Sequence, residues 1–147
     1  MQSKKLLERT GCPAPIFKNW LRKGVILPAR PGQGAGTHAD YDEANALALL
    51  IGVKMKEAGV IVTNYAPAFA SLQIWLRESS SLEWKQYAIA MTPQSATISL
   101  VKKSLNLGDI ALVVPLAPIC EVLSQSIEDT GFYQYSLLKL QTVRNSK

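Results

Sequence analysis

With 147 residues, 48% of them hydrophobic and 18% charged, the chain has the size and composition of one soluble globular domain or two small ones. No run of 18 apolar residues occurs, which excludes a hydrophobic transmembrane helix, and the first residues are too few and too charged for a secretory signal. The net charge of +5 is concentrated in residues 1–30, which contain seven Lys and Arg residues and a single acidic residue, Glu8. Such a basic end on a nearly neutral body is typical of a polyanion-binding site. The alternative is a solvated basic surface that binds nothing.

The first two predicted elements are short helices, over residues 3–10 and 13–23. Gly11 separates them. Pro13 and Pro15 fit only the first turn of the second helix, because the backbone N–H groups of a first turn have no acceptor within the helix. The remaining end signals are Ser3, a candidate cap of the first helix, and Gly24, which follows the second.

The second predicted helix has one apolar side and one cationic side. Its apolar residues share a face because they recur at spacings of three and four; they are Ile16, Phe17, Trp20 and Leu21. The other side carries Lys18, Asn19, Arg22 and Lys23. We expect Phe17 and Leu21 in the core, and core packing is also the favoured role of Trp20.

A β-hairpin is predicted after this helix. Residues 25–27 form a short β-type run, residues 37–41 are a candidate returning strand, and the tip contains Gly32, Gly34 and Gly36. The GQGAG stretch does not fit the GxxxxGK[ST] pattern of phosphate-binding loops, and no long apolar strand precedes it. A hairpin tip is therefore the better interpretation of these glycines.

Two further helices are predicted, over residues 43–58 and 64–79. Asp40 or Asp42 caps the former, and Asn64 caps the latter, with Pro67 in its first turn. The buried stripe of the former consists of Ala44, Leu47, Ala48, Ile51, Met55 and Ala58, Lys54 and Lys56 lie on its solvated side, and Gly59 ends it. The apolar side of the latter consists of Phe69, Leu72, Trp75 and Leu76.

The C-terminal half changes from helical to alternating periodicity and is predicted as β-β-β-α-β. The strands are residues 84–92, 96–103, 108–116 and 132–140, with a turn at 92–95 and a helix at 117–131 that ends at Gly131. Its stripe is Ile119, Val122, Leu123 and Ile127, and Tyr87, Ile89 and Met91 share one face of the first strand. The run at 108–116 is continuously apolar, which favours a covered strand. The fold class is thus α+β, with residues 1–62 and 63–147 as domains and the second as a dimerisation or interaction module rather than a ligand sensor.

An enzyme is not predicted. His38 is the single histidine, and a lone histidine in a loop is more often a solvated side chain than a catalyst or ligand. Cys12 and Cys120 are far apart and neither belongs to a CxxC pair, which indicates reduced thiols of a cytoplasmic protein rather than a disulfide or a zinc site. We expect no metal and no cofactor. Two domains of roughly 60 and 85 residues would have small cores, so a second subunit would help to stabilise them.

The order helix, turn, helix, hairpin, helix over residues 3–59 is that of a winged helix-turn-helix. The residues resemble the DNA-binding domain of the MerR family of bacterial transcription regulators. The matches are Thr10-Gly11-Cys12 at the opening, Phe17, Lys18 and Trp20 in the second helix, Gly24-Val25-Ile26 with Pro28 after it, Arg30, Tyr41 at the end of the wing, Asp42 and Glu43 opening the next helix, and Gly59 closing it.

This resemblance implies a homodimeric, sequence-specific regulator of double-stranded DNA, bacterial or phage, with no membrane partner. Helix 13–23 would lie in the major groove and wing 29–39 on the backbone. The candidate DNA-binding residues are Lys18, Asn19, Arg22, Lys23, Arg30, Lys4, Lys5 and Trp20. Asn19 has the donor and acceptor that an adenine edge requires, whereas the cations suit phosphates or base edges.

The sequence also departs from the family. Ala39 stands where the wing usually has an arginine, Lys18 replaces an arginine and so loses bidentate contact, and Pro13 and Pro15 are unusual in a recognition helix. The helix at 64–79 is short for the family's dimerising coiled coil. Two alternatives stay open: an excisionase-like factor that bends DNA, which the large C-terminal half disfavours, and a protein-interaction or adaptor module whose winged helix binds no DNA.

Overall fold

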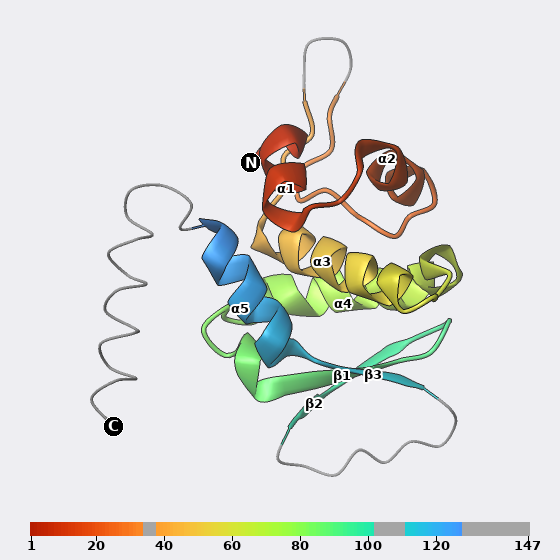
Figure 1. The fold of residues 1–147 in the computed structure, drawn as a ribbon, viewed down its shortest axis with the longest axis vertical. Coiled ribbons are helices and arrows are strands. Elements are labelled where there is room, and N and C mark those ends of the chain that lie inside the picture. Colours follow the sequence, from red (N-terminus) through yellow and green to blue (C-terminus); the bar gives the residue numbers. More distant parts are fainter. Residues whose placement is uncertain (34–37, 102–110, 128–147) are drawn as a thin grey trace, which may run out of the picture.

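The computed structural model describes residues 1–33, 38–101 and 111–127. In these residues the chain forms five α-helices, two short 3-10 helices and a three-stranded antiparallel sheet (Figure 1). The helices are α1 (Ser3–Thr10), α2 (Ala14–Arg22), α3 (Glu43–Glu57), α4 (Ala66–Glu78) and α5 (Leu116–Ile127), the 3-10 helices are η1 (Val62–Tyr65) and η2 (Trp84–Gln86), and the strands are β1 (Tyr87–Met91), β2 (Ala96–Leu100) and β3 (Leu112–Pro115). This mixed architecture confirms the predicted α+β class.

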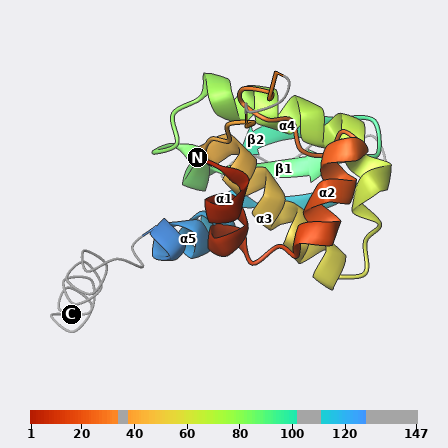
Figure 2. The same ribbon diagram turned by 90° about the horizontal axis from the view of Figure 1, so that it is seen from above.

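The helix α3 lies at the centre of the molecule. α1, α2 and the two arms of the loop between α2 and α3 lie on one side of it and the sheet lies on the other, while α4 runs alongside α3 (Figures 1 and 2). α5 contacts α1, α3, β1 and η2. One cluster of buried apolar side chains extends from Leu6 in α1 to Leu123 in α5. Elements from both sides of residue 62 therefore share a core, while the division into two domains stays a prediction.

The helix α1 has the predicted bounds but not the predicted cap. Gln2 occupies the N-cap position, Ser3 is the first helical residue, and no side chain caps the helix. Gly11 ends α1 in the left-handed conformation, with φ at 70°, and its N–H donates to Leu7 O. The prediction that Gly11 ends the first helix is confirmed. Glycine is favoured at this position because a left-handed backbone conformation strains residues that have a Cβ.

The end of α2 explains why residues 25–27 form no strand, contrary to the prediction. Gly24 adopts φ of 78°, its N–H donates to Leu21 O, and the N–H of Val25 donates to Trp20 O at 2.9 Å. These two bonds are the Schellman arrangement that closes a helix. It turns the chain inward, so Val25 and Ile26 enter the core at 0% and 1% exposure instead of pairing with another strand.

The predicted hairpin is reduced to a single backbone bridge in the described residues. Arg30 N donates to Asp40 O at 3.1 Å, and Asp40 N donates to Arg30 O at 2.7 Å. Residues 37–41 otherwise form no strand where they are described, and the predicted tip at Gly34 and Gly36 lies outside the described residues.

Of the two candidate caps of α3, Asp42 is the correct one. Its carboxylate accepts from Asn45 N at 3.0 Å, and Asn45 Oδ1 accepts from Asp42 N at 3.1 Å, which completes a capping box. The predicted buried stripe is confirmed except for Ala58, which is exposed at the end of the helix. α3 buries residues on all sides because other elements surround it, whereas the sequence predicted one buried face.

The start of α4 also differs from the prediction. Asn64 lies within η1, Tyr65 is the N-cap residue without a capping side chain, and Pro67 occupies the first turn as predicted. The apolar side is confirmed: Phe69, Leu72 and Leu76 are buried, and Trp75 packs partly buried against the core. The burial of Gln73 among them was not predicted.

The strands are ordered β2-β1-β3, and both pairings are antiparallel. The predicted turn at 92–95 joins β1 to β2, and Thr92 and Ser95 exchange two backbone hydrogen bonds there. β3 is an edge strand in the described sheet, with Val113 46% exposed, so the interpretation of a covered strand is wrong. In α5, Ile119 and Leu123 are buried as predicted, but Val122 is 40% exposed. Gly131, strand 132–140 and the side chain of Ile127 lie outside the described residues.

Candidate nucleic-acid interface

The cations of α2 lie opposite its buried residues. Phe17 and Trp20 are 3% and 4% exposed and face the core. The side chains of Lys18, Arg22 and Lys23 are exposed. The outer side of the helix thus offers Lys18 and Arg22, and the C-cap residue Lys23 adds a third positive charge; no carboxylate of the described residues neutralises these three by an ion pair.

Asn19 is half-buried on the same helix, and its amide oxygen is already engaged. Arg22 Nη2 donates to Asn19 Oδ1 at 2.8 Å, within a single helical turn. This bond holds the guanidinium of Arg22 over α2. An adenine edge needs both the donor and the acceptor of an asparagine amide, and because an amide oxygen has two lone pairs, Asn19 can offer both while it also accepts from Arg22.

Trp20 packs against α3, which is the core role that the sequence favoured. A Cβ placed on Gly52 would lie 2.8 Å from Trp20 Cζ3, so the indole occupies the space above a residue without a side chain. Next to it, Phe17 meets Tyr41 edge-on with ring centroids 5.5 Å apart. These two contacts fix α2 against α3 and against Tyr41, which precedes α3.

Arg30 is exposed and forms the backbone bridge to Asp40, beside a group of contacts that joins this bridge to residue 1. The Met1 ammonium donates to Asp40 Oδ1 at 2.7 Å and to Tyr41 O at 2.6 Å, and Tyr41 N donates to Met1 O at 2.8 Å. The ammonium, and more weakly Arg30, lower the pKa of Asp40 below its ordinary range.

Lys4 and Lys5 are exposed on α1. In Figure 1, α1, α2 and the two arms of the loop between α2 and α3 lie on the same side of α3. Seven of the eight candidate residues have an exposed or half-buried side chain, and they belong to these elements. The eighth, Trp20, lies in the core.

Arg9 belongs to the basic end of the sequence but not to its surface. Its guanidinium forms two parallel bonds with Glu43, from Nη1 to Oε1 at 2.6 Å and from Nη2 to Oε2 at 2.8 Å. The Arg9 side chain is 5% exposed and that of Glu43 is 45% exposed. Arg9 thus joins α1 to the first turn of α3, and its charge is not available to a polyanion.

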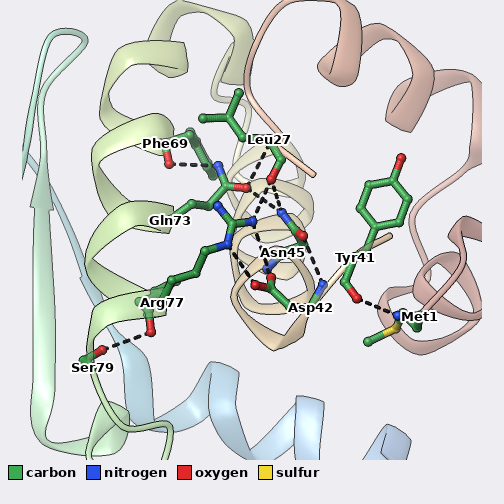
Figure 3. A network of polar contacts seen from close by, with 10 residues as sticks. Met1, Leu27, Tyr41, Asp42, Asn45, Phe69, Gln73, Arg77 and Ser79 are labelled. Carbon is green, nitrogen blue, oxygen red and sulfur yellow. Dashed lines mark hydrogen bonds and ion pairs between the residues drawn. The ribbon is translucent and has the colours of Figure 1, made fainter. Parts of the chain in front are cut away.

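Sequence reasoning missed Gln73, a polar side chain of α4 that is wholly buried. Gln73 Nε2 donates to Phe69 O at 2.9 Å, and its Oε1 accepts from Leu27 N at 3.1 Å (Figure 3). Asn45 Nδ2 also donates to Gln73 Oε1, at 2.9 Å. Gln73 Nε2 also donates to Val25 O at 2.9 Å. A glutamine in an apolar stripe was the available signal, because a buried amide needs partners on other elements.

Other reactive side chains are few in the described residues. Both cysteines are free and buried, and burial raises the pKa of Cys12 to about 11 and also raises the pKa of Cys120. His38 is exposed in the loop between α2 and α3. No three His, Cys, Asp or Glu side chains in the described ranges gather as a possible metal site. None of the described helices has the length and apolar character needed to cross a membrane.

No protein-family model matches the chain, and no curated protein matches it. The resemblance of residues 3–59 to the MerR family therefore stays a prediction that rests on the residues themselves.

Proposed function

We propose that the protein is a sequence-specific regulator that binds double-stranded DNA with α2 in the major groove and residues 29–39 as a wing along the backbone. The observation that carries the proposal is the two-sided character of α2. Phe17 and Trp20 hold one side in the core, Lys18 and Arg22 are exposed on the other, and Lys23 is exposed at the C-cap. An α-helix fits the major groove, and cations on its outer side meet phosphates or base edges there.

The neighbouring elements support this arrangement. Lys4 and Lys5 belong to α1 and Arg30 to the loop between α2 and α3, and both elements lie on the same side of α3 as α2 (Figure 1). Contacts from these residues to phosphates would orient the protein without reading sequence. Sequence would be read by Arg22, whose guanidinium suits guanine, and by Asn19, whose amide offers an adenine edge both a donor and an acceptor. We further propose a homodimer, so that two α2 helices enter successive major grooves one helical turn apart.

The test is a double substitution of the exposed cations. In the variant with Lys18→Ala and Arg22→Ala we expect duplex affinity to fall by at least about tenfold, since each lost phosphate contact weakens binding and lowers its salt dependence. The thermal midpoint should stay nearly unchanged because both side chains are exposed. Duplexes selected from random sequence by the parent protein are the ligand, and affinity is measured at two salt concentrations.

The matched control removes two exposed cations elsewhere, with Lys54→Ala and Lys85→Ala. If both double variants bind the selected duplex equally, α2 is not the recognition element. If the parent selects no duplex even at low salt, the DNA-binding proposal itself fails, and a protein-interaction role is the alternative that remains.

A further inference from the structure

Residues 25–27 connect α2 to the wing without belonging to a helix or a strand. Their backbone groups are nevertheless hydrogen-bonded. The N–H of Leu27 donates to Gln73 Oε1 at 3.1 Å, and the carbonyl of Val25 accepts from Gln73 Nε2 at 2.9 Å. One side chain of α4 thus takes the place of a neighbouring strand.

The carbonyl of Leu27 is held by two more side chains. It accepts from Asn45 Nδ2 at 2.6 Å and from Arg77 Nη2 at 2.7 Å (Figure 3). Arg77 Nε also donates to Asp42 Oδ2 at 2.8 Å. Arg77 therefore links the connection to the residue that caps α3, from a position one helical turn beyond Gln73 in α4.

This network is closed around Gln73. The side chain is fully buried, and both its oxygen and its nitrogen have two partners each. An unpaired amide in such a place would be unfavourable, so the bonds of Gln73 are expected to form together or to break together. Any shift of α4 against α3 would separate Leu27 from its partners and change the direction in which the chain leaves α2.

We propose that Gln73 and Arg77 are positioning residues that fix the connection 25–27 and thereby the placement of the wing relative to α2. The proposal rests on the proposed DNA-binding function where it concerns affinity. A protein that contacts a groove with a helix and the adjacent backbone with a wing needs a constant distance between the two. Neither residue would touch DNA; each acts through Leu27.

Hydrogen exchange of the Leu27 amide tests the positioning directly. Arg77→Met leaves the acceptor of this N–H in place but removes a bond to the Leu27 carbonyl. We expect the Leu27 amide to exchange at least tenfold faster than in the parent, with no change at the α3 amides of Leu49 and Leu50. Unchanged exchange at Leu27 would overturn the proposal. Gln73→Met should accelerate exchange of the Leu27 amide further, provided that this variant folds. Because Arg77 lies nearer the surface than Gln73, the Arg77→Met variant is expected to fold and decides the test if Gln73→Met does not.

Duplex affinity tests the consequence. Lys54→Met is the matched control, because Lys54 is also an exposed helical cation with an acidic partner, Glu57 at 3.4 Å. We expect Arg77→Met to bind about tenfold more weakly than Lys54→Met and with a smaller salt dependence, because a misplaced wing loses phosphate contacts. Arg77→Lys, which keeps the charge, should recover part of the loss.

The outcomes separate the two proposals. Equal affinity of Arg77→Met and Lys54→Met would show that the connection does not position the wing for DNA. If weaker binding accompanies a lower thermal midpoint and the salt dependence of binding is unchanged, Gln73 and Arg77 only stabilise the fold and do not position the wing. A parent that binds no duplex would refute the proposed function, while the exchange rate at Leu27 would still decide whether Gln73 and Arg77 fix the connection.

Discussion

Arg9 carries a positive charge into the core, and Glu43 compensates it there through two bonds shorter than 3 Å. Loss of one partner of a buried pair leaves an uncompensated charge, which typically costs about 3–5 kcal/mol. The cost of losing Glu43 would be smaller because its carboxylate is 45% exposed and water can partly replace it. The role of Arg9 is thus to join α1 to α3, and the basic surface near α2 depends on other residues.

Cys12 gives a prediction about pH. Burial raises the pKa of its thiol from near 9 to about 11, because the thiolate is poorly solvated in the core. A raised folded-state pKa contributes stability that is complete below pH 9 and is lost as the pH rises through 11. We expect the free energy of unfolding to fall over this range by on the order of 2 kcal/mol from Cys12 alone.

Urea unfolding of the parent and of Cys12→Ala at several pH values measures this loss. The buried Tyr41, whose pKa is also raised, acts in the same direction but cancels in the comparison. The variant should be less stable below pH 9, and its stability should decline less steeply above it. Parallel pH profiles for the two proteins would mean that the thiol ionises as readily in the fold as in the unfolded chain.

At the scale of elements, the packing of α2 on α3 depends on Gly52. Alanine is favoured over glycine in a helix by about 1 kcal/mol, but a Cβ here would lie 2.8 Å from Trp20 Cζ3. The indole is 4% exposed and has little space to move. We expect Gly52→Ala to destabilise the protein by about 1–3 kcal/mol because overpacking exceeds the gain in helix propensity.

A double-mutant cycle isolates this contact. Trp20→Phe removes the outer ring atoms that the new Cβ would meet. Urea unfolding should then show that Gly52→Ala costs less in the Trp20→Phe background than in the parent. An equal cost in both backgrounds would assign the effect to something other than the indole.

Elements that are specified by nearby residues, such as a glycine at a helix end or a regular apolar spacing, could be predicted from the sequence. The ends of α1, α2 and α3 follow from glycines that adopt positive φ, and the two-sided pattern of α2 follows from its spacing. The residues 25–27 have strand-like composition, yet Gln73, 46 residues away from Leu27, decides their hydrogen bonding. The Arg9–Glu43 pair is also long-range. Bonds of this kind leave no periodic signal. The exposed cations of the candidate site and the unusual place of Gln73 in an apolar stripe can be read from the sequence, but the distant partners of Gln73 and Arg77 cannot.

At the scale of the whole molecule, the shared core joins the regions before and after residue 62. Buried residues of α3 such as Leu47 and Ile51 belong to the same cluster as Phe69 in α4 and Leu123 in α5. A segment that ends at residue 62 would expose this surface of α3 to water. The cost of that exposure, about 25 cal/mol for each Å² of apolar surface, favours unfolding of both regions together.

We therefore expect one cooperative unfolding transition, and the tryptophans allow each region to be followed separately. Trp20 reports on α2, and Trp84 reports on the region beside β1 and α5. Thermal unfolding of two single-tryptophan variants, each with the remaining two tryptophans replaced by Phe, should give each protein one midpoint that agrees with its own far-UV circular dichroism. A fluorescence midpoint for Trp20 that departs from the circular dichroism midpoint of the same variant would indicate that residues 1–62 unfold as a separate domain. The bonds of Gln73 to Val25 and Leu27 cross this boundary. Separate unfolding would therefore mean that these bonds do not couple the stability of the candidate DNA-binding region to that of α4.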